Sequence, residues 1–171
     1  MLSLFLGLFF GCAGGTDDTG TLVDSDGQEW PRLWINEFMA SNKETLEDST
    51  GASPDWVEIY NDTSETVDLE GWTVSDNLGE PDKHTLGALE IPANGFLLLY
   101  AGGTPEVGEQ HLSFKLGSGG EEIGLYTPGG QVSDELDFGP QEQDVSTART
   151  TDGGSEWTTT ADATPGESNE D

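Results

Sequence analysis

The stretch that decides the fold is residues 55–61, which read Asp-Trp-Val-Glu-Ile-Tyr-Asn. Successive side chains of a β-strand point to opposite faces, so Val57 and Ile59 share one side of an extended chain. The alternation predicts a strand with one buried face, and places Val57 and Ile59 in the core. The opposite face carries the aromatic side chains of Trp56 and Tyr60, and is a candidate surface for contact with a ligand.

Short apolar runs of the same kind recur along the chain about every ten residues, separated by Gly, Pro, Asn and Asp. No stretch shows a sustained apolar period of 3.6 residues with helix caps. Evenly spaced short strands are typical of all-β sandwiches and barrels. The predicted strands are 33–40, 56–60, 66–69, 72–75, 84–86, 96–101, 112–116, 122–126, 132–138 and 145–149.

The predicted core follows from these strands. Residues 96–100, Phe-Leu-Leu-Leu-Tyr, are the most apolar run, so we expect a central strand covered on both faces. Trp72 follows Gly71 at a tight turn and is expected to fill the space between two sheets. Six side chains are therefore predicted to be buried: Trp72, Phe96, Leu98, Val57, Ile59 and Leu125.

Composition limits what the protein can do. Its 171 residues suit one domain, and 34 acidic against 5 basic residues give a formal net charge of −29. Five scattered cations cannot form the basic patch that nucleic-acid binding requires, which excludes nucleic acid as a partner. The single cysteine excludes an intramolecular disulfide. His84 and His111 are far apart and no nucleophile motif is present, so we expect the protein not to be an enzyme.

The N-terminus has the features of a targeting signal. Residues 1–11 are a continuous apolar stretch, too short to span a bilayer but as long as the apolar region of a signal peptide. Cys12 follows directly, an arrangement that resembles a bacterial lipobox and predicts a lipidated Cys12. The alternatives are an ordinary signal with a free cysteine, or a buried N-terminal strand. Residues 12–31, rich in Gly, Thr, Ser and Asp, predict an acidic flexible linker before a domain at 32–169.

Four polar side chains in or beside two predicted strands are candidate metal ligands: Asn36, Glu37, Asp55 and Glu58. Buried carboxylates need hydrogen-bond donors or a cation, and Lys and Arg are scarce in this chain. Oxygen ligands of this kind suit calcium, so a calcium site is the candidate here, and no other cofactor is expected. The alternative is that these residues serve ordinary turn and capping roles.

Longer motifs carry a resemblance to a known family. They are residues 34–42 (WINEFMASN), 55–61 (DWVEIYN), 67–76 (VDLEGWTVSD), 91–96 (IPANGF), 119–125 (GGEEIGL) and 163–169 (ATPGESN). In this order they resemble the lamin tail domain family in its bacterial form. The resemblance implies an immunoglobulin-like β-sandwich. It also implies DNA and protein partners, but the missing basic surface removes the DNA contact.

These observations favour a non-catalytic interaction or structural module of a bacterial cell envelope. The expected location is lipid-anchored through Cys12, at the outer membrane or cell surface, with membrane contact through the lipid alone. Expected partners are a protein or an envelope polysaccharide. The alternative is an accessory domain for calcium-dependent adhesion or carbohydrate binding. A small hydrolase does not fit, because no general acid with its base can be identified.

Overall fold

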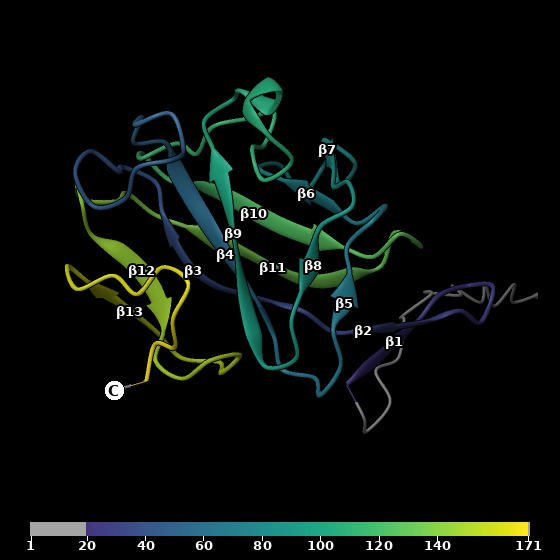
Figure 1. Ribbon diagram of the computed structural model, residues 1–171. Coiled ribbons are helices and arrows are strands. Elements are labelled where there is room, and N and C mark those ends of the chain that lie inside the picture. Colours follow the sequence, from purple (N-terminus) through teal and green to yellow (C-terminus); the bar gives the residue numbers. More distant parts are fainter. Residues whose placement is uncertain (1–19, 171) are drawn as a thin grey trace, which may run out of the picture.

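The computed structural model describes residues 20–170 and consists of antiparallel strands with one 3₁₀ turn, η1 (Pro105–Val107) (Figure 1). One sheet has five strands in the spatial order β13 (Trp157–Thr160), β12 (Ser146–Arg149), β3 (Trp34–Met39), β4 (Asp55–Asn61) and β9 (Gly95–Ala101). The other has four, in the order β11 (Val132–Phe138), β10 (Glu121–Tyr126), β6 (Thr73–Ser75) and β7 (His84–Thr85). Two short pairs complete the fold: β1 (Thr21–Val23) with β2 (Glu29–Pro31), and β5 (Val67–Asp68) with β8 (Glu90–Ile91).

The two larger sheets face each other around one apolar core, which confirms the predicted all-β, immunoglobulin-like sandwich. Val57 and Ile59 on β4 are fully buried, as the alternation in residues 55–61 predicts. Trp72 and Leu125 are also fully buried, so four of the six predicted core residues are confirmed. Within residues 20–170 no helix is long and apolar enough to cross a membrane.

The prediction for β9 was wrong in position and in phase. β9 is the edge strand of the five-stranded sheet, and Phe96 and Leu98 are only half-buried. Pairing with β4 sets Leu99 opposite Val57, so Leu99 is the leucine that enters the core. Phe96 and Leu98 lie on the outer face of the sheet, because a strand's side chains alternate. An unbroken apolar run carries no alternation, and its phase is set by the neighbouring strand.

The described part of the predicted linker is not a flexible chain. Residues 21–31 form the hairpin of β1 and β2, in which the Asp24 side chain accepts hydrogen bonds from the backbone N–H groups of Asp26 and Gln28. The indole of Trp30 meets that of Trp72 edge to face, at 6.5 Å between ring centroids. This contact anchors the hairpin on the sandwich, since an isolated two-stranded hairpin is marginally stable. Residues 1–19, with the predicted signal and Cys12, lie outside the described residues.

Besides β1 and β2, two further strands were not predicted, and one predicted strand is absent. β8 and β13 form where the sequence lacks apolar alternation; their pairing with β5 and β12 holds them instead. Residues 112–116 form no regular strand, and Lys115 makes only an isolated bridge to Gly102. That bridge places Lys115 beside the end of β9.

Candidate functional site

Two buried glutamates lie side by side on the outer face of the five-stranded sheet. Glu37 on β3 is directly opposite Glu58 on β4, and both side chains are fully buried. An irregularity in the pairing between Ile35 and Glu37 leaves Asn36 without a partner on β4, as in a β-bulge. Asn36 and both glutamates therefore come together, as the candidate ligand set requires.

Every oxygen of the two carboxyl groups accepts a hydrogen bond from the protein. Glu37 accepts from the Ser146 hydroxyl at 2.5 Å and from the N–H and hydroxyl of Thr164 at 3.1 and 3.2 Å. Glu58 accepts from the Asn36 amide at 3.1 Å and from the backbone N–H of Gly166 at 2.6 Å. The five donor groups are neutral, and three of them, from Thr164 and Gly166, belong to the C-terminal segment.

A third carboxylate extends this network to the chain's end. Asp152, in the turn between β12 and β13, accepts from the Asn36 amide at 3.0 Å. It also accepts from the Ser168 hydroxyl at 2.5 Å and the Asn169 N–H at 3.0 Å. We call the set of Asn36, Glu37, Glu58 and Asp152 with residues 164–169 the C-terminal clasp.

Burial dominates the electrostatics of the clasp. It raises the pKa of Glu58 to about 8, against the hydrogen bonds from Gly166 and Asn36 that lower it. Burial also raises the pKa of Glu37, and the charge of Asp152 adds to this. Glu58 therefore holds its proton at neutral pH. The clasp fastens the C-terminal segment to the sheet with one carboxyl kept neutral.

The structure corrects the candidate calcium site. Asp55 is three residues from Glu58 on the same strand, so the two side chains point to opposite faces. The Asp55 carboxylate instead accepts from the Asn42 N–H at 2.9 Å, at the end of the strand. Within residues 20–170 no three Asp, Glu, His or Cys side chains converge as metal ligands would. The turn and capping interpretation describes Asp55 better than a metal role does.

The aromatic side chains of β4 divide into one buried and one partly open. Trp56 is fully buried, and its indole N–H has no hydrogen-bond partner among the described residues. Tyr60 is half-buried and stacks on Phe96 of β9 with ring centroids 4.9 Å apart. Of these two side chains, only Tyr60 therefore contributes surface that a ligand could touch.

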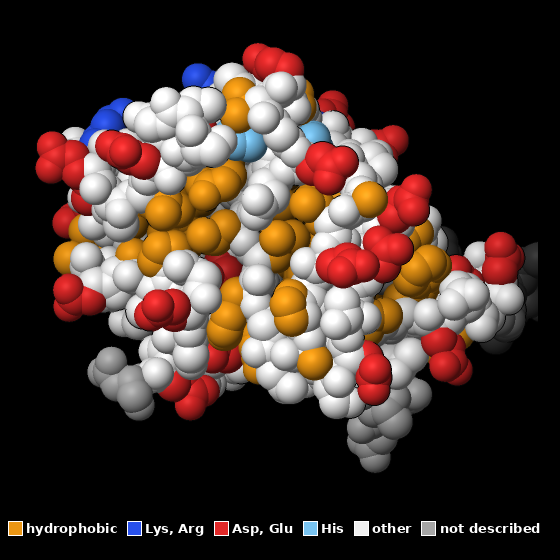
Figure 2. Space-filling model, viewed as in Figure 1, with side chains coloured by type: hydrophobic (Ala, Val, Ile, Leu, Met, Phe, Trp, Pro, Cys, Tyr) orange, Lys and Arg blue, Asp and Glu red, His pale blue; other side chains and the backbone are white. Residues whose placement is uncertain are grey.

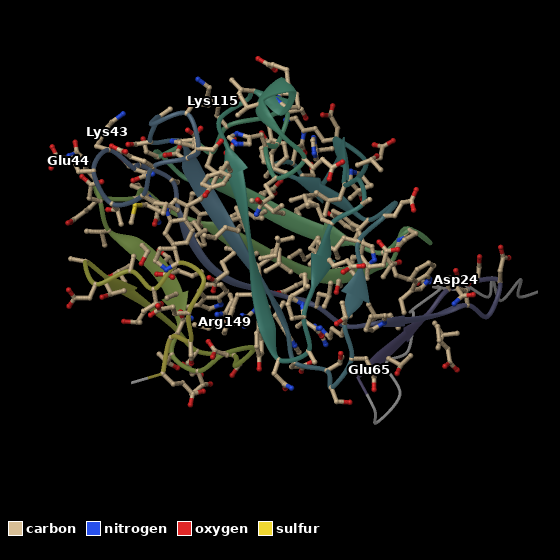
Figure 3. The ribbon with its side chains drawn as sticks, in the orientation of Figure 1. Asp24, Lys43, Glu44, Glu65, Lys115 and Arg149 are labelled. Atoms are coloured by element: carbon tan, nitrogen blue, oxygen red, sulfur yellow. The ribbon has the colours of Figure 1, made fainter. Side chains whose placement is uncertain are left out.

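A recess of about 360 Å³ with polar and apolar walls opens at one end of the sandwich, and we call it the lysine recess. It lies between the loop that joins β3 to β4, the residues that follow β9, and Lys115. Its charged and hydroxyl lining consists of Lys43, Lys115, Asp48, Asp55, Ser53 and Thr104. Lys43 and Lys115 both reach the surface at this end of the molecule (Figure 3).

Sequence reasoning did not find this recess or the buried ion pair of Arg149 with Asp134, 2.7 Å apart. Each set joins residues from segments far apart in the chain, and no local spacing marks them. One signal was present: a chain with five basic residues can hold very few ion pairs, so the surroundings of each basic residue are informative.

Comparison with protein families matches the chain to the model described as Lamin Tail Domain over residues 28–140. Searches of curated proteins and of solved structures find no match. The family match covers more than half of the chain and includes β2 through β11 of the sandwich described above. The chain therefore belongs to the lamin tail domain family.

Proposed function

We propose that this protein is a non-catalytic interaction module of a bacterial cell envelope, held there by a lipid on Cys12. The non-catalytic part of the proposal rests on the structural roles of the buried acidic side chains. Glu37 and Glu58 fasten the C-terminal segment, and Asp134 pairs with Arg149 across the two sheets. These groups stabilise the framework, and none of the three lines the lysine recess. Lamin tail domains are usually structural or interaction modules, which agrees with this proposal.

Membrane fractionation tests the anchor. Cells expressing the full chain should carry it in the membrane fraction, because the acyl chains of a bacterial lipoprotein bury enough CH₂ groups for stable attachment. The Cys12→Ser variant should move to the soluble fraction, while Ala13→Ser, next to it, should stay with the membrane. A Cys12→Ser variant that sediments like the wild type would remove lipid anchoring from the proposal.

Binding of envelope material tests the module itself. The Cys12→Ser chain, immobilised on a resin, is offered the polysaccharide and protein fractions of bacterial envelopes separately. Saturable retention of one fraction on the folded chain, and not on heat-denatured chain, is expected. Equal retention on both, or none on either, would contradict an interaction role.

The second candidate is a carbohydrate-binding accessory domain. The lysine recess favours it, because hydroxyl and charged side chains together line a cavity at the lower end of the size range of ligand sites. Calcium-dependent adhesion has no comparable support, since Asp55 points away from the other three candidate ligands, and within residues 20–170 no three Asp, Glu, His or Cys side chains are placed to hold a metal ion.

A further inference from the structure

The five basic side chains differ in how many contacts they make with other side chains. Arg149 pairs with Asp134, and Lys83 forms an ion pair with Asp76. The guanidinium of Arg32 lies 4.1 Å from the ring centroid of Trp34 and donates to a backbone carbonyl. Among residues 20–170 the side chains of the remaining two, Lys43 and Lys115, form no ion pair, hydrogen bond or ring contact. Both line the lysine recess.

Two unpaired ammonium groups at one recess are unexpected in this protein. With 34 acidic residues against 5 basic ones, a basic side chain on the surface would readily find a carboxylate partner. On the face seen in Figure 2, red acidic groups are spread widely while blue basic groups gather at one end. The lysine recess is therefore a place in the described structure where an anionic group would meet two ammonium groups that form no ion pair, beside the carboxylates of Asp48 and Asp55 in the same lining.

The backbone around the recess holds Lys115 and the loop wall in place. Gly102 bridges to Lys115, and the N–H of Gly103 donates to the carbonyl of Phe114 at 2.9 Å. Asn42, which is almost fully buried, donates its amide to the carbonyl of Pro54 at 2.7 Å. The recess is thus formed before any ligand arrives, which reduces the entropy lost on binding.

The acidic residues of the lining indicate which other chemical groups a ligand of the recess would carry. Asp55 is half-buried and one of its oxygens is used by the Asn42 N–H. Burial raises its pKa, and the nearby charges of Lys43 and Lys115 oppose that rise. The second Asp55 oxygen can accept from a ligand hydroxyl. Asp48 and Asp55 together would repel a doubly charged group such as phosphate more strongly than a singly charged carboxylate.

We propose that the lysine recess binds an acidic saccharide, a sugar that carries one carboxylate per residue. Its carboxylate would lie between Lys43 and Lys115, and its hydroxyl groups would donate to Asp55 and exchange hydrogen bonds with Ser53 and Thr104. This inference rests on the proposed interaction function and names the ligand class and the site. Uronic-acid polymers of envelopes and matrices have this chemistry.

Calorimetric titration with trigalacturonate in calcium-free buffer tests the proposal. Trigalacturonate should bind saturably, and its methyl-esterified form, which differs in lacking the negative charges, should bind far more weakly. The variant with Lys43→Gln and Lys115→Gln should bind about tenfold more weakly, since two charge contacts are lost. The Lys43→Arg and Lys115→Arg variant should retain binding. Lys83→Gln is the matched control, because it removes one positive charge outside the recess.

Several results would overturn the assignment. They are equal binding of the acid and its ester, unchanged binding by the double glutamine variant, phosphate binding as tight as trigalacturonate, and no binding of trigalacturonate at all. The envelope retention assay separates this failure from that of the proposed function. If the Cys12→Ser chain retains envelope material but does not bind trigalacturonate, only the recess assignment falls; if retention is also absent, the interaction role falls with it.

Discussion

Two buried acidic residues show how differently one fold can accommodate a carboxyl group. Asp134 accepts from the guanidinium of Arg149 and from the backbone N–H of Ile35. Glu58 has no basic partner among the described residues, and its donors are an amide and a backbone N–H. Without a cation nearby, Glu58 avoids the cost of a buried charge by keeping its proton. The two residues should therefore respond differently to pH and to substitution.

Glu58 should make the protein less stable as pH rises. The unfolded chain releases this proton near pH 4.5, while the folded chain holds it to about pH 8. The contribution of Glu58 to stability should therefore be greatest below pH 4.5, decline across the window by up to about 1.4 kcal/mol per pH unit, and level off above about pH 8. Urea unfolding at a series of pH values measures this slope.

Glu58→Gln is the variant that isolates this effect, because it removes the titration and nearly preserves the shape. Its unfolding free energy should vary less between pH 4.5 and 8 than that of the wild type. Glu70→Gln, on the exposed surface, should keep the wild-type slope. A Glu58→Gln variant with the full wild-type slope would mean that Glu58 does not titrate in this window.

Arg149 should be among the most sensitive positions in the core. Arg149→Met leaves Asp134 buried without its charge partner, which typically costs about 3–5 kcal/mol. Adding Asp134→Asn removes the unpaired charge and should restore part of the loss. Urea unfolding of the single and double variants measures this coupling. Equal stability of the two variants would show that Asp134 loses little when Arg149 is gone.

At the scale of elements, the buried face of a strand could be predicted only where the strand's own residues alternate between apolar and polar. β4 alternates, so its buried face could be predicted from residues 55–61. β9 does not, and its phase comes from pairing with β4. The hairpin of β1 and β2 was missed because its polar composition is that of a linker, and because the contact of Trp30 with Trp72 joins residues far apart in the chain. At the site, Glu37 and Glu58 are adjacent because their strands are neighbours in the sheet. The hydrogen-bond donors in residues 164–169 could not be predicted, because they lie far from both glutamates in the sequence.

Two adjacent leucines on β9 test its orientation directly. Leu99 is fully buried between the sheets, whereas Leu98 is half-buried on the outer face. Leu99→Ala should therefore lower the unfolding free energy by about 2–5 kcal/mol, and Leu98→Ala by clearly less. The side chain removed is identical, so unfolding in urea compares position alone. A larger loss for Leu98→Ala would reverse the phase of β9.

At the scale of the whole molecule, the net charge of −29 opposes folding. A compact domain holds its carboxylates closer together than an unfolded chain does, so repulsion destabilises the folded state at low salt. The two ion pairs of the described residues, Lys83–Asp76 and Arg149–Asp134, offset little of this. Salt should therefore matter more to this protein than to one of balanced charge.

Sodium chloride should raise the melting temperature, because the Debye length falls from about 30 Å at 0.01 M salt to about 3 Å at 1 M. Calcium chloride at matched ionic strength should give a similar rise, since no carboxylate cluster converges within residues 20–170. Calorimetric melting curves in the two salts measure the difference. A rise specific to calcium, and lost in Asp55→Asn, would restore the candidate calcium site.

The placement of the five basic residues also determines how trypsin, which cleaves after Lys and Arg, would attack the native protein. Arg149 is buried and Arg32 is half-buried over Trp34, so cleavage at either requires the sandwich to open. Lys43, Lys83 and Lys115 are exposed, and two of them border the lysine recess. The order in which peptides appear in a digest would thus report separately on ligand occupancy at one end and on global unfolding.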